Sequence, residues 1–140
     1  MSENMQGEAG ASGPPDFTLA PAEPVFAPLI PELRRLANAY RVSTSEVDDE
    51  LLLLFVEQLQ QVVAGLTRAM TARDDAGLRK GAHSLLGMGG TIGVPELSVV
   101  GGEMRAAVIQ CDFGRCEDLL RALQVWMRLL ETGVKGADGV

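Results

Sequence analysis

The only histidine of the chain, His83, stands among residues whose types suit chemistry at an imidazole ring. On a helical wheel at about 100° per residue, Arg79, Gly87 and Gly90 lie within about 40° of His83. Lys80 lies at about 60°, on one flank. A neutral imidazole keeps one ring nitrogen free to act as a nucleophile, so His83 is a candidate acceptor of an electrophilic group.

The residues one helical turn before and after His83 would favour an incoming phosphoryl group. Glycine inside a helix costs about 0.5–1 kcal/mol relative to alanine, so Gly87 needs a compensating role. It removes the side chain that would crowd the imidazole and lets another protein surface approach a ring nitrogen. Arg79 and Lys80 place positive charge where a phosphoryl group carries negative charge. Taken alone, the two cations are more simply read as part of a solvated helix face.

A helix must present this histidine to solvent, and the pattern around it predicts one over residues 76–90. The apolar stripe of that helix lies about 140° to 220° away from the histidine and consists of Leu78, Leu85, Met88 and Ile92. Because such a stripe faces the core, we expect His83 to point outward from a bare strip lined by glycine.

Four further helices are predicted from apolar residues at spacings of three and four. They cover residues 28–40, 46–71, 95–111 and 113–132. Pro95 suits the first turn of the third of these, whose apolar stripe runs from Leu97 to Cys111. Within it, Gly101 and Gly102 either permit close helix packing or mark a kink. Gly133 is expected to end the last helix.

These elements predict an all-α protein, because no run of alternating apolar and polar residues suggests a strand between residues 45 and 133. Four amphipathic helices with short connections are typical of an antiparallel up-and-down four-helix bundle, here with an additional short N-terminal helix packed across one end. Residues 1–24, rich in Gly, Ala, Ser, Pro and Glu, are expected to form a flexible N-terminal tail. Residues 25–134 form the helical bundle domain, and residues 135–140 a frayed C-terminal tail.

Composition argues against several classes of function. Lys and Arg number 12 against 19 Asp and Glu, and a net charge of −7 without a basic patch argues against nucleic acid as a partner. No segment reaches the ~20 uncharged residues of a membrane span. Residues 1–15 lack the order of a secretory signal, so a cytoplasmic protein is expected. Cys111 and Cys116 support neither a zinc site nor a disulfide framework.

The stretch Ala82-His83-Ser84-Leu85-Leu86-Gly87, followed by Gly93, resembles the signature A-H-x-L-K-G of the histidine-containing phosphotransfer (HPt) family. The likeness extends over about residues 51–130 through the order of the helices and the positions of the loops. It implies that His83 accepts a phosphoryl group, with Nε2 as the usual attacking nitrogen. The residues expected to contact the phosphoryl group or the docked partner are Arg79, Lys80, Ser84, Leu86, Gly87 and Gly90.

The resemblance implies a phosphorelay intermediate, in which His83 takes a phosphoryl group from the aspartate of one receiver domain and passes it to another receiver. The partners would be receiver domains of response regulators or of hybrid histidine kinases, and the protein itself a monomer. No cofactor or metal is expected on this chain, because the Mg²⁺ needed for transfer is held by the receiver. No autonomous kinase activity is expected, since no H-E-type acceptor box and no glycine-rich ATP lobe is present.

Leu86 departs from the family pattern, which usually has a lysine at this position. Arg79 or Lys80 is a candidate substitute for that charge. The departure leaves an alternative open, a phosphotransfer-silent helical adaptor that binds or sequesters a receiver domain. In either case we expect the partner surface to combine the outer strip of helix 76–90 with the facing side of the preceding helix, around Gln60, Ala64 and Thr67.

Overall fold

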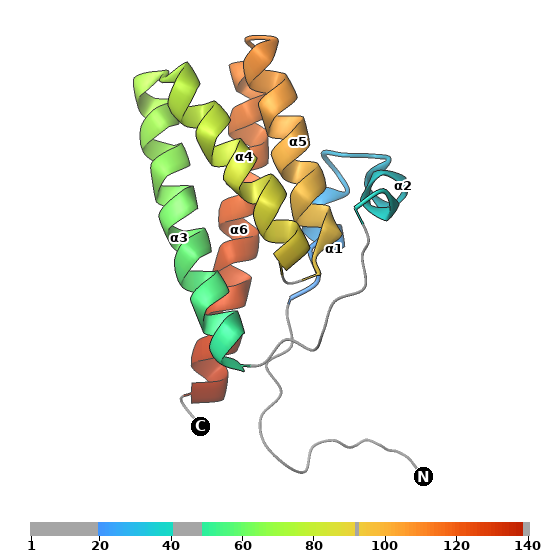
Figure 1. Cartoon of the computed structure of the whole chain (residues 1–140), viewed down its shortest axis with the longest axis vertical. Helices are drawn as coiled ribbons and strands as arrows, with labels where there is room; N and C mark the ends of the chain where they lie inside the picture. The colour runs from blue at the N-terminus through green and yellow to red at the C-terminus, as the bar shows by residue number, and fades with distance from the viewer. Residues whose placement is uncertain (1–19, 41–48, 92, 139–140) are drawn as a thin grey trace.

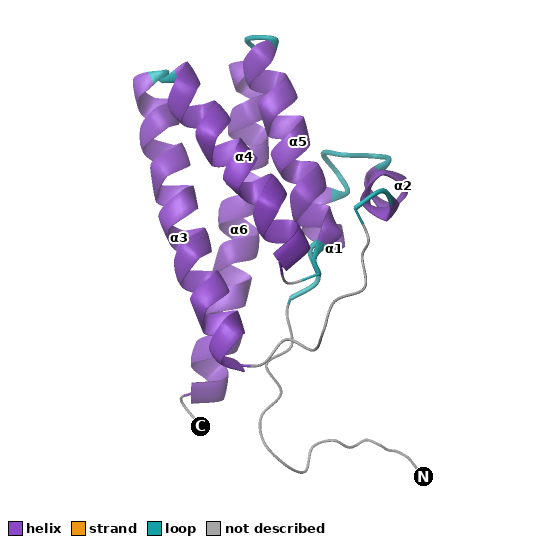
Figure 2. Ribbon diagram, viewed as in Figure 1, coloured by secondary structure: helices purple, strands orange, loops and turns teal. Residues whose placement is uncertain are grey.

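The computed structural model describes residues 20–40, 49–91 and 93–138, with side chains as far as Thr132. Within these ranges every regular element is a helix and no strand is present (Figure 2). The helices are α1 (Glu23–Phe26), α2 (Leu33–Asn38), α3 (Asp49–Ala72), α4 (Asp75–Thr91), α5 (Pro95–Ile109) and α6 (Phe113–Asp138). The predicted all-α class is therefore confirmed.

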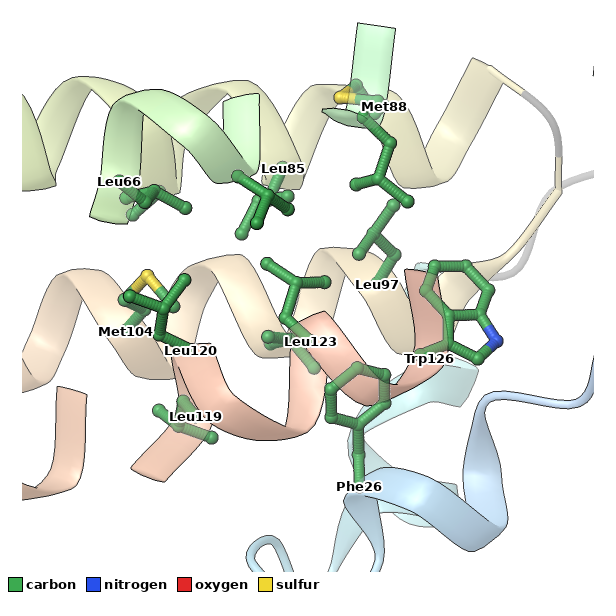
Figure 3. Close-up of a cluster of buried hydrophobic side chains, with 14 of the residues drawn as sticks. Phe26, Leu66, Leu85, Met88, Leu97, Met104, Leu119, Leu120, Leu123 and Trp126 are labelled. Atoms are coloured by element: carbon green, nitrogen blue, oxygen red, sulfur yellow. The ribbon is translucent and has the colours of Figure 1, made fainter. Parts of the chain in front are cut away.

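Helices α3 to α6 form an antiparallel up-and-down four-helix bundle, in which each helix runs in the opposite direction to the helix before it (Figure 1). Their apolar stripes meet in one core (Figure 3). Its fully buried side chains include Leu59, Leu66, Leu78, Leu85, Leu97, Met104, Leu119, Leu123 and Trp126. The rings of Phe26 and Phe55 pack edge-on against Trp126, with centroids 6.1 and 6.3 Å away.

The α3–α4 and α5–α6 turns are built alike. Arg73 follows α3 and Cys111 follows α5, and both have a left-handed backbone, with φ of 54° and 59°. An aspartate comes next in each turn. Asp74 accepts a hydrogen bond of 3.2 Å from a backbone N–H in the first turn of α4, and Asp112 accepts one of 3.1 Å from the first turn of α6. These carboxylates therefore cap the helices that follow them.

Cys111 does not belong to the buried stripe of α5, contrary to the expectation from sequence. The helix ends at Ile109, and the left-handed turn at Cys111 places this residue on the surface. Cys116, one turn into α6, is the buried cysteine. The periodicity of three and four predicted the wrong face here because the helix had already ended.

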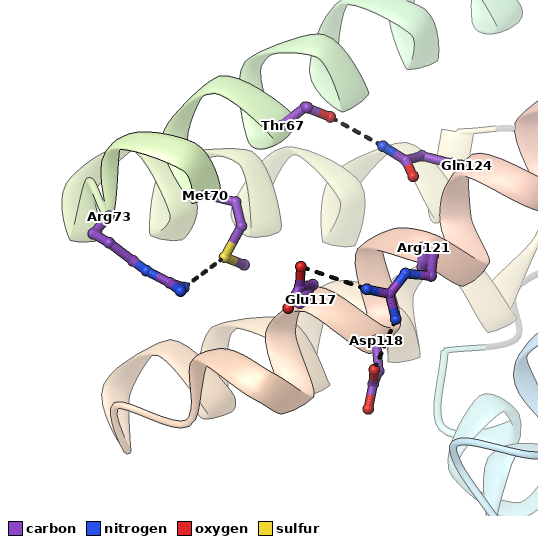
Figure 4. Close-up of polar contacts among 7 residues, drawn as sticks. All are labelled: Thr67, Met70, Arg73, Glu117, Asp118, Arg121 and Gln124. Carbon is purple, nitrogen blue, oxygen red and sulfur yellow. Dashed lines mark hydrogen bonds and ion pairs between the residues drawn. The ribbon is translucent and has the colours of Figure 1, made fainter.

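Arg73 connects the two turns at this end of the bundle. Its guanidinium carbon lies 5.2 Å from the centroid of the Phe113 ring, within the range of a cation–π contact. Its Nη1 lies 3.3 Å from the sulfur of Met70 (Figure 4). One side chain thus links the α3–α4 turn to the start of α6.

The N-terminal segment differs from the single helix expected over residues 28–40. It contains the short helices α1 and α2, with Pro28 and Pro31 between them. Proline lacks a backbone N–H and disfavours helical backbone at the preceding residue, so a continuous helix does not form. The segment packs beside α5 and α6 and not across one end of the bundle (Figure 1).

Hydrogen bonds attach the N-terminal segment to α6. The indole N–H of Trp126 donates to the carbonyl oxygen of Ala20 at 2.8 Å. Nη1 of Arg115 donates to the carbonyl oxygen of Leu29 at 2.8 Å. Ala22 is buried, so residues 20–24, which composition assigned to the N-terminal tail, pack on the bundle. Residues 1–19 lie outside the described part of the chain.

The last helix is longer than expected. Helix α6 passes through Gly133 and includes residues 135–138, which were expected to fray. Glycine ends a helix when it adopts the left-handed conformation, and otherwise lowers helix propensity by only about 1 kcal/mol. Residues 139 and 140 lie outside the described residues.

Candidate functional site

His83 lies on α4 with its side chain exposed to solvent. Leu78, Leu85 and Met88, on the opposite side of the helix, are buried, as the helical wheel predicted. Ile92, the fourth residue of that stripe, lies outside the described residues. Within the described part of the chain, the imidazole has no hydrogen bond or ion pair. A ring nitrogen is therefore accessible to a docked protein.

The surface beside His83 is bare backbone. Gly87 and Gly90 are exposed, and a Cβ added at either position would meet nothing within 4 Å. Gly89 is different, because a Cβ there would lie 2.3 Å from Oγ of Ser98. Packing against α5 explains Gly89, whereas no internal contact explains Gly87 or Gly90. These two glycines leave room for another molecule next to the histidine.

The two cations expected to contact a phosphoryl group are placed differently. Arg79 forms an ion pair with Asp75, one turn earlier on α4. Lys80 forms no ion pair with any residue that the structure describes, and it lines a groove between α3 and α4. Lys80 therefore offers positive charge beside His83, while Arg79 is already partly neutralised.

Leu86 and Ser84 bring no positive charge to the site. Leu86 is half-buried, and its carbonyl oxygen accepts a hydrogen bond of 2.8 Å from Oγ of Ser98. The hydroxyl of Ser84 donates to the carbonyl oxygen of Lys80 at 3.2 Å, within α4. Neither residue supplies the positive charge that a lysine at position 86 would bring.

Close packing of α5 on α4 holds the segment that carries His83. A Cβ at Gly101 would lie 2.6 Å from the carbonyl oxygen of Ala82 and 2.7 Å from the backbone nitrogen of Leu86. Only glycine allows the two backbones to approach this closely. Of the two readings left open for Gly101, close packing is therefore the observed one. Gly102, by contrast, would tolerate a Cβ, whose nearest neighbour outside the helix backbone is the Tyr40 hydroxyl at 3.8 Å.

Sequence reasoning missed Ser98 and Arg68. Ser98 is buried, and its partner is a backbone atom on another helix. Its signal in the sequence is one hydroxyl among the apolar residues Leu97, Val99 and Val100. Arg68 lies on α3 and, like Lys80, lines the groove between α3 and α4.

This groove has a volume of about 650 Å³ and lies beside the histidine helix. Its α4 side is formed by Gly77, Lys80, Gly81 and Ser84. Its α3 side includes Gln58, Gln61, Val62, Gly65 and Arg68. Helix α4 approaches α3 closely here, because a Cβ at Gly81 would lie 2.4 Å from a methyl carbon of Leu66.

The α3 residues expected on this side of the bundle were the wrong ones. Gln60 donates a hydrogen bond of 2.6 Å to Glu131. Thr67 accepts one of 3.2 Å from Gln124, as Figure 4 shows. With Ala64 they line a second hollow, between α3 and α6. They therefore lie on the flank of α3 that faces away from α4.

The described residues contain no group of three or more His, Cys, Asp and Glu side chains placed to hold a metal ion. Among the same residues, no helix is both long and apolar enough to cross a membrane.

The fold and the site define a class: a helical bundle that presents one accessible histidine beside bare helix backbone. The Hpt domain family model matches residues 50–133, which is more than half of the chain and includes His83. The chain therefore belongs to the histidine-containing phosphotransfer (HPt) family. Proteins of this family act by histidine phosphotransfer in phosphorelays and interact with receiver domains. No curated protein and no solved structure matches the chain significantly.

Proposed function

We propose that this protein is a phosphorelay intermediate that accepts a phosphoryl group on His83 from the aspartate of one receiver domain and passes it to another. The observation that carries the proposal is the exposed imidazole next to Gly87 and Gly90, where an added Cβ would meet nothing within 4 Å. A receiver must bring its aspartate to within bonding distance of the ring, and bare backbone permits that approach.

In the transfer step, a ring nitrogen of His83 attacks the phosphorus of the aspartyl phosphate. A nitrogen–phosphorus bond forms while the bond from phosphorus to the aspartate oxygen breaks, and the aspartate leaves as a carboxylate. The second transfer reverses these changes on another receiver. We assign the Mg²⁺ that offsets the phosphoryl charge to the receiver. Lys80 adds positive charge on the HPt side. A monomeric state and a cytoplasmic location are part of the same proposal.

One observation supports a second candidate function, an adaptor that binds or sequesters a receiver without transfer. Leu86 is half-buried and uncharged where the family usually has lysine. A receiver could dock on the same surface without efficient transfer to His83.

Incubation with a receiver domain phosphorylated on its aspartate separates the two functions. The relay predicts an acid-labile, base-stable phosphoryl label on the wild-type protein and none on His83→Gln, with unchanged helix content by circular dichroism. Complex formation without label would support the adaptor. A labelled His83→Gln protein would show that another residue is the acceptor.

A further inference from the structure

We propose that the groove between α3 and α4 selects receiver domains that carry acidic side chains at the docking surface, and that Arg68 and Lys80 are the residues that select them. This inference rests on the proposed function and adds the chemistry of the partner. Arg68 comes from α3 and Lys80 from α4, so the groove has one cation on each side.

Lys80 is available for a partner. It is exposed, and within the described part of the chain its ammonium group has no ion-pair partner. It precedes His83 by three residues on the same helix, so its side chain lies on the groove flank of the histidine. A protein that docks over His83 from this side would meet the ammonium group.

Arg68 is available as well, on the outer face of α3, where it borders both this groove and the hollow between α3 and α6. A Cβ added at Gly65 would lie 3.9 Å from Nη2 of Arg68, so the guanidinium reaches back over this glycine. Gly65 itself lines the groove. Arg68 is exposed and forms no ion pair with a described residue. The N–H groups of its guanidinium are therefore available to a docked receiver.

Charged residues at the end of the groove beside the α3–α4 turn have partners of their own. Asp74, the one acid that lines it, caps α4 by accepting a hydrogen bond from the N–H of Gly77. Arg79 pairs with Asp75, and Arg73 stacks on Phe113. The remaining polar residues of the α3 wall are neutral glutamines. Asp74 keeps its negative charge, so the lining has two positive charges and one negative charge, a net charge of +1.

This local charge contrasts with the net charge of the whole chain, which is −7. A protein of that charge repels an acidic partner at long range, so two cations at the docking surface would orient the encounter and favour partners with complementary acids. Charges at the rim of an interface act mainly on association and specificity. We therefore expect Arg68 and Lys80 to affect KM more than kcat.

The test measures phosphoryl transfer from a panel of purified receiver domains of different surface charge, each phosphorylated with acetyl phosphate in the presence of Mg²⁺. Reversal of both charges, Arg68→Glu with Lys80→Glu, should lower kcat/KM about tenfold at low salt, chiefly by raising KM, and the difference from wild type should shrink as NaCl is added. The exchange Arg68→Lys with Lys80→Arg keeps both charges and should retain most of the rate.

A matched control reverses Arg34 and Arg35 on α2, which lies beside α5 on the side of the bundle away from α3 (Figure 1). It changes the net charge by the same amount and should leave kcat/KM near the wild-type value. Equal rates for the groove and control variants would overturn the inference while leaving the relay intact. Failure of the wild-type protein to accept phosphoryl groups from any receiver would instead overturn the proposed function. Circular dichroism verifies that each variant folds.

Discussion

The hydroxyl of Ser98 on α5 donates a hydrogen bond of 2.8 Å to the backbone carbonyl oxygen of Leu86 on α4. Ser98 is buried, and Leu86 lies three residues after His83. The bond joins the helix that carries the histidine to its closest neighbour in the bundle. It therefore helps to set the orientation in which α4 presents His83.

Ser98→Ala should lower the free energy of unfolding by about 1 kcal/mol, because a buried hydrogen bond is lost. Ser84→Ala is the matched control, since Ser84 also donates to a backbone carbonyl but lies at the surface of α4. Urea unfolding followed by circular dichroism measures both. Equal losses of unfolding free energy in the two variants would show that the Ser98 hydrogen bond contributes no more to stability than the Ser84 hydrogen bond.

Gly101→Ala should destabilise the protein by about 1–3 kcal/mol, because the new methyl group would push α5 away from the backbone of α4. Gly102→Ala is the neighbouring control. Its Cβ would make only an ordinary contact, so the protein should keep or gain stability. Thermal unfolding of the two variants is the measurement. A Gly101→Ala protein as stable as wild type would contradict the close packing.

Gly87→Ala should separate stability from function. Its Cβ meets nothing within 4 Å, so the variant should gain about 0.5–1 kcal/mol of stability from helix propensity. Phosphoryl transfer to His83 should slow, because the methyl group occupies the space that a docked receiver needs. A more stable variant with an unchanged transfer rate would show that the clearance at Gly87 is not used.

Leu86→Lys should raise the rate of phosphoryl transfer several-fold, because it adds positive charge on the flank of His83 opposite Lys80. Leu86 is only half-buried, so the lysine stem can lie along the surface and stability should fall by about 1 kcal/mol or less. Leu86→Met is the uncharged control. The comparison of transfer rates at equal receiver concentration decides whether charge at this position matters.

The two cysteines should react at very different rates with a thiol reagent such as Ellman's reagent. Cys111 is exposed, whereas burial, together with the negative charge of Asp112, raises the pKa of the Cys116 thiol above its usual 9.0. One thiol should therefore react rapidly in the folded protein, and Cys111→Ser should abolish that phase. Rapid reaction that survives in Cys111→Ser would contradict the burial of Cys116.

The raised pKa of Cys116 also has a consequence for stability. Since folding favours the neutral Cys116 thiol, the free energy of unfolding should fall as pH rises above 9.0.

The order of the main helices and the outward position of His83 were predictable because apolar residues at helical spacing define a buried stripe. The stripe does not define which of its two flanks meets which neighbour. Gln58 and Gln60 flank the stripe of α3 on opposite sides, and only the hand of the bundle places Gln58 beside α4. The expectation that Gln60, Ala64 and Thr67 lie on the α4 side of α3 was wrong for this reason.

Contacts between helices could not be predicted from the sequence either. Ser98 and Gly101 act through backbone atoms of α4, and such contacts depend on the distance between two helices rather than on any local pattern. The division of the N-terminal segment into α1 and α2 was less hidden, because Pro28 and Pro31 disfavour a continuous helix. The capping turns at Asp74 and Asp112 follow ordinary rules for helix starts.

The packing of the N-terminal segment on Trp126 has a practical consequence for moving this domain into other proteins. The family match begins at residue 50, yet Phe26 and Leu33 belong to the same core as Trp126. A fragment shortened to residues 50–133 would present the indole and its surroundings to water, and exposed apolar surface of that kind promotes self-association. A transplant into a chimeric relay should therefore begin no later than Ala20, whose carbonyl oxygen receives the indole hydrogen bond.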